Sequence, residues 1–278
     1  MKIQTNHITL HYLDHNPDSN APLLVLMHGL SANAHCFDGL VAAGLTASFR
    51  VVSVDLRGRG QSDKPATGYS MADHSADIIG LLDALGAEQV ILGGHSFGGL
   101  LTMYTAVHYP TRVSKLIIMD AAGSLHPNVR ELIKPSLARL EKTLPSWEAY
   151  RDAMKAQPFL HGLWDDALEA YYRADVEVRD DGTAVPRSDP HAIWSAADLA
   201  IEEPWAEHLA QIHQPALLIR APENYGPAPI LPPEQAQETV NALANCTYVE
   251  VQGNHMTMLF GERATAVVEA IETFVNGQ

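Results

Sequence analysis

The residue best suited to nucleophilic chemistry is Ser96, in the motif Gly94-His95-Ser96-Phe97-Gly98. This G-x-S-x-G pattern follows an apolar run and precedes a stretch with helical character. A serine forced into a sharp turn between a strand and a helix presents its hydroxyl away from both elements. A Cβ at Gly94 or Gly98 would collide with neighbouring backbone. The motif therefore predicts a serine nucleophile at a helix start, where free N–H groups face the reaction centre.

Short apolar runs recur along the chain and predict the sheet that would carry this turn. The first two runs alternate apolar and polar residues, which predicts a hairpin at a sheet edge. Most later runs are continuously apolar, as is typical of strands covered on both faces, and helical spacing separates them. This alternation predicts a mostly parallel sheet of eight strands flanked by helices. The expected strands are 2–5, 7–13, 23–27, 51–55, 89–94, 115–120, 216–221 and 247–251, and the clearest helices are 71–85 and 263–275.

The regular recurrence of apolar, strand-like runs stops after the sixth run. Amphipathic stretches and a polar turn at 179–190 occupy the interval before the seventh. Because a structureless loop of this length is unusual in a compact domain, we interpret the interval as a mostly helical insertion over the end of the sheet. The amphipathic stretches are 128–143, 146–156 and 165–175. We expect a core domain of residues 1–123 and 206–278 and a helical cap, or lid, of residues 124–205.

The motifs around Ser96 and in three other loops resemble those of the α/β-hydrolase superfamily, specifically its serine hydrolases with a helical cap. The resemblance covers nearly the whole chain and is closest to the branch of the meta-cleavage-product and (acetamidomethylene)succinate hydrolases. It implies the α/β-hydrolase fold, with the cap inserted after the sixth strand and a catalytic triad that needs no cofactor. The other motifs are His28-Gly29-Leu30, Asp55-Leu56-Arg57-Gly58-Arg59-Gly60-Gln61-Ser62 and Gly253-Asn254-His255.

The resemblance implies that His255 is the catalytic base. His255 follows the last strand-like run and precedes the final helix, as the chain order serine, acid, histidine requires. His28 and His95 instead lie inside backbone-shaping motifs, where a histidine more readily braces a loop than transfers a proton. The Nε2 atom of His255 would take the Ser96 proton and return it to the leaving group.

The acid of the triad has two candidates. Most relatives carry it after the seventh strand, where this chain has Asn224, whose amide cannot stabilise an imidazolium as a carboxylate does. The neighbouring carboxylate is Glu223, and Asp120 ends the sixth strand, 24 positions beyond Ser96. Some branches, including the (acetamidomethylene)succinate hydrolase and, with Glu, the zearalenone-type lactonases, place the acid after that strand. We therefore favour Asp120 and keep Glu223 as the alternative.

Two backbone N–H groups are implied as the oxyanion hole, those of Leu30 and of Phe97 directly after the nucleophile. The role depends on backbone position, and Gly29 would let the loop approach the serine closely. Arg57 and Arg59 flank a glycine in the second motif, and we interpret them as braces of the surrounding loops.

Composition limits the partners of the protein. Among 278 residues, 18 Lys+Arg face 33 Asp+Glu, and the net charge of −15 argues against nucleic acid or an anionic membrane surface. Cys36 and Cys246 form no metal-spaced set, and no metal or nucleotide motif occurs, so neither a metal nor another cofactor is implied. No stretch has the length of a signal-peptide core or a membrane span. We expect a cytoplasmic protein with a small-molecule substrate, for which a homodimer is one compatible assembly.

These residues together predict a cofactor-independent serine hydrolase, similar to carboxylesterases, that cleaves a small carboxylic ester, lactone or amide through an acyl-enzyme. Hydrolysis of a carbon–carbon bond in a diketone-like substrate is the next alternative. A cofactor-free dioxygenase on the same fold and a non-catalytic ligand receptor are rival classes that no sequence feature favours. Dehalogenase and epoxide-hydrolase chemistry is disfavoured because those relatives carry Asp where this chain has Ser96.

Overall fold

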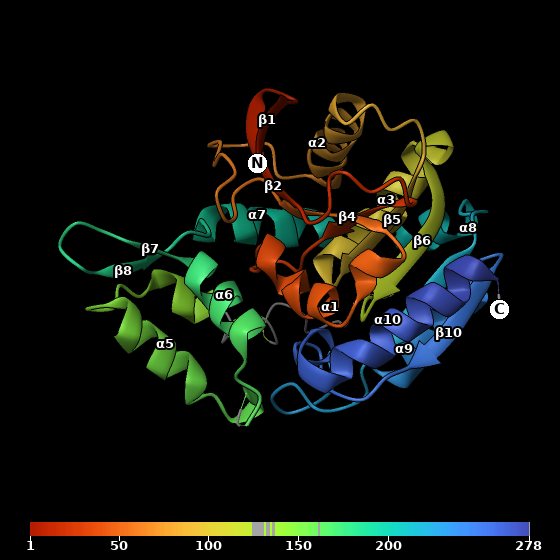
Figure 1. The fold of residues 1–278 in the computed structure, drawn as a ribbon. Coiled ribbons are helices and arrows are strands. Elements are labelled where there is room, and N and C mark those ends of the chain that lie inside the picture. Colours follow the sequence, from red (N-terminus) through yellow and green to blue (C-terminus); the bar gives the residue numbers. More distant parts are fainter. Residues whose placement is uncertain (124–130, 132–133, 135–136, 161, 278) are drawn as a thin grey trace.

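The sheet is the organising layer of the computed structural model, which describes residues 1–123, 131, 134, 137–160 and 162–277. Its order is β1-β2-β4-β3-β5-β6-β9-β10, with β1 and β2 forming an antiparallel hairpin and β2 running antiparallel to β4 (Figure 1). The other neighbouring strands are parallel, which confirms the predicted eight-stranded, mostly parallel sheet. The strands are β1 (Lys2–Thr5), β2 (Ile8–Asp14), β3 (Leu23–Met27), β4 (Arg50–Asp55), β5 (Val90–His95), β6 (Val113–Met119), β9 (Ala216–Arg220) and β10 (Cys246–Glu250).

Helices cover both faces of the sheet. In β3, Val25 and Met27 pack into one hydrophobic cluster while Leu24 and Leu26 pack into the other, as alternate side chains of a fully covered strand must. The first cluster contains residues of α2, α3, α8 and α9, and the second contains residues of α1 and α10. These helices are α1 (Asp38–Ala42), α2 (Met71–Ala84), α3 (Phe97–His108), α8 (Trp205–Ala210), α9 (Pro233–Ala242) and α10 (Gly261–Asn276).

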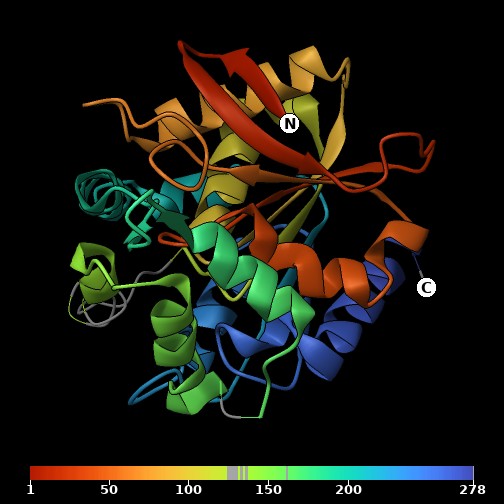
Figure 2. The same ribbon diagram turned by 60° about the vertical axis from the view of Figure 1, so that its left-hand side comes forward.

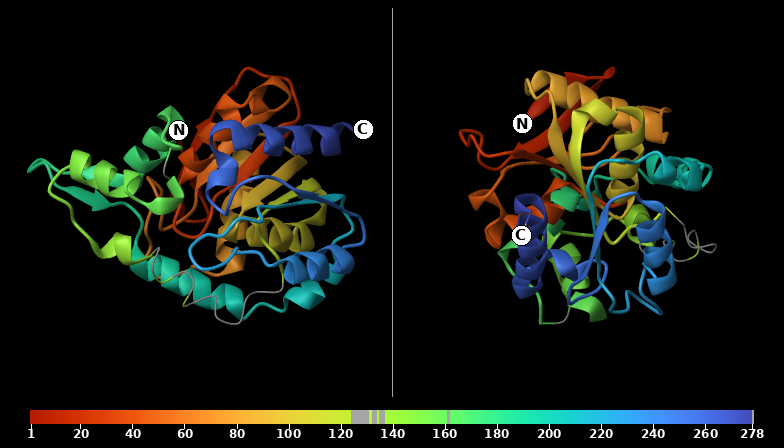
Figure 3. Two further views of the ribbon diagram at one scale, coloured as in Figure 1. Left: turned by 90° about the horizontal axis from the view of Figure 1, so that it is seen from below. Right: turned by 90° about the vertical axis from the view of Figure 1, so that its right-hand side faces the viewer.

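The chain between β6 and β9 forms a separate group of elements, which Figures 2 and 3 show in green and teal beside the sheet. Two of its helices match the amphipathic stretches predicted at 146–156 and 165–175. The predicted stretch at 128–143 and the expected boundary at 124 lie partly outside the described residues. Besides α8, the described elements of this interval are η4 (Ala138–Glu141), α5 (Trp147–Lys155), η5 (Pro158–Leu160), α6 (Asp166–Asp175), β7 (Val176–Val178), β8 (Ala184–Pro186) and α7 (Pro190–Ile201).

One prediction in this interval was incomplete. The polar turn expected at 179–190 contains strand β8, which pairs antiparallel with β7 and closes a small hairpin. Each strand has three residues, too few for an alternating pattern to stand out from a loop. The remaining short 3₁₀ turns are η1 (Ala34–Phe37), η2 (Leu45–Ala47), η3 (Pro110–Arg112) and η6 (Thr257–Leu259). Within the described chain, none of the helices combines the length and apolar character that crossing a membrane requires.

Candidate active site

Ser96 occupies a strained turn between β5 and α3. Its backbone has φ 55° and ψ −118°, a conformation that costs a non-glycine residue energy and that clusters at functional sites. A Cβ at Gly94 would lie 2.0 Å from the carbonyl oxygen of Gly98, and a Cβ at Gly98 would lie 1.9 Å from that of Met27. Both positions therefore require glycine, as expected from the motif. The turn is held in place by the Ser96 N–H, which donates to the Met119 carbonyl at 2.9 Å.

Asp120 follows the neighbouring strand β6 and also has a left-handed backbone, with φ 50°. Its N–H donates to the carbonyl of Ile219 at 2.7 Å, and its Oδ1 accepts the N–H of Ala221 at 3.0 Å. The side chain is buried, and its second oxygen lies 2.6 Å from Nδ1 of His255. The end of strand β9 and the residue after it thus fix the position of Asp120, and the imidazole that its carboxylate contacts comes from the loop after β10.

His255 is oriented from two sides. The Asp120 carboxylate accepts from Nδ1–H, which leaves Nε2 free to accept a proton. On the other side, Nε2 of His95 donates to the His255 carbonyl at 2.7 Å, and the two imidazole centroids lie 4.4 Å apart. Burial, and secondarily the proximity of His255, lowers the pKa of His95 well below its usual value, so His95 acts as a neutral donor. His95 therefore braces the loop that carries His255.

Ser96, His255 and Asp120 line one cavity. The hydrogen bonds of the described residues include Asp120 to His255 but not His255 to the Ser96 hydroxyl. Catalytic hydrogen bonds are often long in structures without substrate and tighten when it binds. The structure therefore brings the hydroxyl, imidazole and carboxylate to the same cavity wall, with the carboxylate–imidazole contact already formed.

The alternative acid, Glu223, contacts the loop that precedes His255. Its carboxylate accepts the N–H of Gly253 at 3.1 Å, and its own N–H donates to the Gly253 carbonyl at 3.0 Å. The side chain is solvent-exposed, and its contacts stabilise the loop just before His255 rather than the imidazole itself. Asn224, at the position where relatives carry the acid, is also exposed and lies at the cavity wall.

Leu30 and Phe97, the two oxyanion candidates, both line the cavity beside Ser96. Phe97 is the first residue of α3, so its N–H has no acceptor within the helix. The loop that carries Leu30 approaches closely: a Cβ at Gly29 would lie 3.4 Å from the Ser96 Cβ. His28 ties this loop down, because its Nδ1 donates to the Gly29 carbonyl at 2.7 Å while its Nε2 accepts the Leu56 N–H at 3.0 Å.

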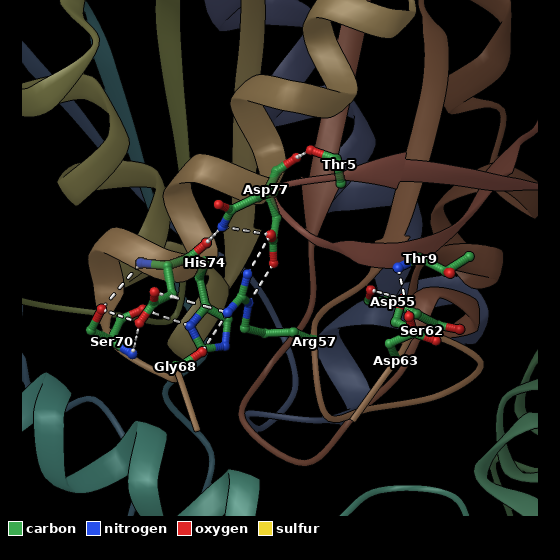
Figure 4. A network of polar contacts seen from close by, with 12 residues as sticks. Thr5, Thr9, Asp55, Arg57, Ser62, Asp63, Gly68, Ser70, His74 and Asp77 are labelled. Atoms are coloured by element: carbon green, nitrogen blue, oxygen red, sulfur yellow. Dashed lines mark hydrogen bonds and ion pairs between the residues drawn. The ribbon is translucent and has the colours of Figure 1, made fainter. Parts of the chain in front are cut away.

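The Asp55-to-Ser62 motif builds the scaffold beneath that loop. The Asp55 carboxylate accepts the N–H of Ala34 at 2.7 Å and that of Gln61 at 2.9 Å, which joins two loops through one buried side chain. Arg57 forms a two-pronged pair with Asp77 on α2, at 2.6 and 2.5 Å (Figure 4). These contacts bear out the interpretation of Arg57 as a brace.

Arg59 has a different environment from Arg57. Its Nε donates to the Leu30 carbonyl at 2.9 Å, and its guanidinium carbon lies 5.4 Å from the centre of the Phe97 ring. Nη1 reaches the Arg57 carbonyl and Nε2 of His74, whereas Nη2 is buried and finds no partner among the described residues. Burial lowers the pKa of Arg59 to about 9. These contacts bear out the interpretation of Arg59 as a brace, and the loop that it braces carries Leu30, one of the two oxyanion candidates.

The cavity has a volume of about 860 Å³ and is closed on one side by the β6–β9 interval. Among its described residues, that interval contributes apolar and aromatic walls and one charged residue, Arg139 of η4. Nη1 of Arg139 donates to the Asp175 carboxylate at 2.6 Å, and Nη2 donates to the Ser31 carbonyl at 2.7 Å. Sequence reasoning missed this pair because Arg139 and Asp175 lie 36 positions apart and no local pattern separates them from solvated surface charges. The described residues include no group of three or more His, Cys, Asp or Glu placed to hold a metal ion.

Comparison with known proteins places the chain in a family. Residues 22–262 match the α/β hydrolase fold family, so the chain belongs to it and the family resemblance seen in the sequence is confirmed. An uncharacterized protein of Mycobacterium tuberculosis is 39% identical over 104 residues, which cover 37% of this chain and 30% of that protein. The 2-(acetamidomethylene)succinate hydrolase of Mesorhizobium japonicum is 34% identical over 152 residues, 54% of this chain and 53% of the relative. The chain thus spans about half, or less, of the length of these two curated relatives.

A solved structure extends the likeness over the full chain. The crystal structure of E-2-(acetamidomethylene)succinate hydrolase superposes with a TM-score of 0.85 and covers 99% of both chains. At 22% sequence identity, this likeness shows a common fold.

Proposed function

We propose that this member of the α/β hydrolase fold family is a cofactor-independent serine hydrolase that cleaves a carboxylic ester, lactone or amide. The observation that carries the proposal is the 2.6 Å contact of the Asp120 carboxylate with His255, at the wall of the cavity that the strained Ser96 also lines. The names of relatives, among them the 2-(acetamidomethylene)succinate hydrolase, support hydrolysis as the reaction class. The bond cleaved is argued from the site alone.

The proposed reaction begins when His255 Nε2 removes the Ser96 hydroxyl proton as the oxygen attacks the substrate carbonyl carbon. Asp120, bonded to Nδ1–H, holds the imidazole in the required tautomer and stabilises the imidazolium that forms. The tetrahedral intermediate collapses when His255 returns the proton to the leaving oxygen or nitrogen. Water, deprotonated by His255, then attacks the acyl-enzyme and releases the acid and the free serine.

The developing oxyanion is stabilised in this proposal by the N–H groups of Leu30 and Phe97. Such a donor lowers the activation free energy by about 3 kcal/mol in comparable sites. Support comes from the close approach of Gly29 to Ser96 and from the position of Phe97 at the first turn of α3. The dipole of α3 adds positive potential at the same point.

The proposed organisation divides the chain into a hydrolase core, residues 1–123 and 206–278, and a cap, residues 124–205. The cap elements α5 and α6 pack on each other, and both contribute residues to the wall of the cavity that Ser96 lines. In this arrangement the core supplies the reacting groups, and the cap encloses the substrate and excludes water.

Covalent labelling tests the proposal directly. A fluorophosphonate should form one adduct on the protein, peptide mapping should place it on Ser96, and the same protein should turn over a p-nitrophenyl ester. Ser96→Ala should abolish both, with a fall in kcat of about 10⁵-fold or more. Thr102→Ala, another hydroxyl on α3, is the matched control and should label normally. Labelling that persists in Ser96→Ala would remove Ser96 from the mechanism.

A further inference from the structure

We propose that the site selects uncharged, largely apolar acyl groups, and that Asp175 causes this selectivity by pairing with Arg139 and neutralising its charge. The inference rests on the proposed function, since it concerns the substrate of the same Ser96 site. It concerns two residues that take no part in the chemical steps, one at the cavity wall and one behind it.

The cavity walls favour apolar substrate surface. The cap contributes Phe159, Tyr171 and Tyr172, and the core contributes Leu100 and Leu259. A cavity of about 860 Å³ accommodates a substrate well beyond an acetyl ester. Burial of a hydrocarbon chain against such walls is favourable, whereas burial of an unpaired carboxylate is strongly unfavourable.

Arg139 is the obvious group to which a substrate carboxylate could bind. Among the residues that the structure describes, the cavity wall contains one arginine, no lysine, and Asp120 as its one carboxylate. The Arg139 side chain keeps 18% exposure, and it lies beside Ser31, next to the oxyanion candidate Leu30. Taken alone, this guanidinium would predict an anionic substrate.

Asp175 changes that prediction. The carboxylate is 1% exposed, accepts from Arg139 Nη1 at 2.6 Å, and also accepts from the Tyr150 hydroxyl. Its other oxygen is buried and has no partner among the described residues. Burial works against the charged form of Arg139, but the Asp175 carboxylate more than offsets this and raises the Arg139 pKa above its usual value. Arg139 and Asp175 thus form a charge pair with no net charge.

A substrate carboxylate would have to compete with Asp175 for the same guanidinium. If Arg139 turned toward the substrate, Asp175 would be buried without its counter-ion. It would then either stay charged at a high cost or take up a proton, which burial already favours by raising the Asp175 pKa. If Arg139 did not turn, the substrate carboxylate would lie against mainly apolar walls and lose part of its hydration without gaining a counter-ion. The surroundings add to the effect, since residues 124–204 carry nine basic and fifteen acidic residues. A neutral substrate avoids both penalties.

Two esters of equal length test the selection. p-Nitrophenyl hexanoate and the mono-p-nitrophenyl ester of adipic acid share a leaving group and a six-carbon acyl chain, and differ in a terminal methyl against a carboxylate. The natural protein should show a kcat/KM about 100-fold higher for the hexanoate. Comparable or greater efficiency with the adipate monoester would overturn the proposal.

Substitution of Asp175 tests its role in the selection. Asp175→Asn should release the Arg139 charge and shift the ratio of kcat/KM values toward the adipate monoester by about tenfold or more. Arg139→Gln combined with Asp175→Asn should reverse that shift. Asp152→Asn, which neutralises an exposed partner of Arg151 in the same cap, is the matched control and should leave the ratio unchanged.

The ratio is measured within one preparation, so the folded fraction of each variant cancels. If Asp175→Asn does not fold, the smaller Asp175→Ser replaces it. If the ratio of the two kcat/KM values were unchanged in a folded Asp175 variant, the proposal that Asp175 neutralises Arg139 toward the substrate would be overturned. Failure of the proposed function is distinguishable, because neither ester would then be turned over and Ser96 would not be labelled.

Discussion

The two sides of the cavity, which we propose to be a hydrolase core and a cap, hold their polar residues by different means. Ser96 and Asp120 end the adjacent strands β5 and β6, and both have a left-handed backbone fixed by neighbouring strands and glycines. Arg139 and Asp175 are instead held through their side chains, by each other and by contacts with Ser31 and Tyr150. We infer that substitutions on the core side change the rate for every substrate, whereas substitutions of the cap pair change which substrate is preferred.

The largest effect in this comparison is expected for Asp120→Asn. Asparagine tolerates the left-handed backbone at this position, so the fold should survive. Its amide can donate to His255 Nδ1 and so favour the wrong tautomer, which lowers kcat by about 10⁴-fold in a comparable triad. Steady-state kinetics with the hexanoate and adipate esters should show the same fractional loss for both, unlike the Asp175 variant.

Glu223→Gln is the control for this prediction. The Glu223 side chain contacts the Gly253 N–H, and a glutamine amide oxygen can accept the same hydrogen bond. Activity should therefore stay within about twofold of the natural protein. If Glu223→Gln lost activity and Asp120→Asn kept it, the acid of the triad would move to the loop after β9.

The core side was largely predictable from the sequence, and the reason is physical. Continuous apolar runs indicated the strands, and a motif that needs glycine at 94 and 98 has few structural solutions. The choice between Asp120 and Glu223 could be argued but not decided, because the reach of a side chain to His255 depends on loop geometry. Arg57 and Arg59 could both be predicted as braces, but not their different partners, since two arginines of one motif differ here only in their three-dimensional contacts.

The cap side was predictable only in outline. Amphipathic spacing gave α5 and α6, but Arg139 and Asp175 lie 36 positions apart on different elements. Nothing in the local pattern separates such a buried charge pair from solvated surface charges. The three-residue strands β7 and β8 were missed for a related reason, since their pairing is tertiary rather than periodic.

The core loops should also respond to pH through a buried histidine. Burial lowers the pKa of His28 to about 4, below its usual value of 6.5. The unfolded chain therefore binds the proton first, and the stability that His28 confers is present above pH 6.5 and lost as the pH falls toward 4. The shift corresponds to about 3 kcal/mol of unfolding free energy.

Urea titrations at pH 7 and pH 4.5 measure this term in the natural protein and in His28→Gln. Glutamine can accept from Leu56 and donate to Gly29 without titrating. The loss of unfolding free energy between the two pH values should be smaller in the variant. Equal losses in both proteins would show that His28 is not the titrating group.

The smallest effect on kcat is expected for Arg59, and the comparison with Arg57 separates two arginines of the same core loop. Arg59→Met removes a buried cation that contacts both Leu30 and Phe97, so kcat should fall about tenfold with little change in KM. Arg57→Met instead leaves Asp77 buried without its partner, which should lower the melting temperature but not kcat per folded molecule. Arg59→Lys, which keeps the charge, should recover part of the kcat. Equal losses of kcat in Arg59→Met and Arg57→Met, measured on titrated active sites, would mean that both arginines only support the loops.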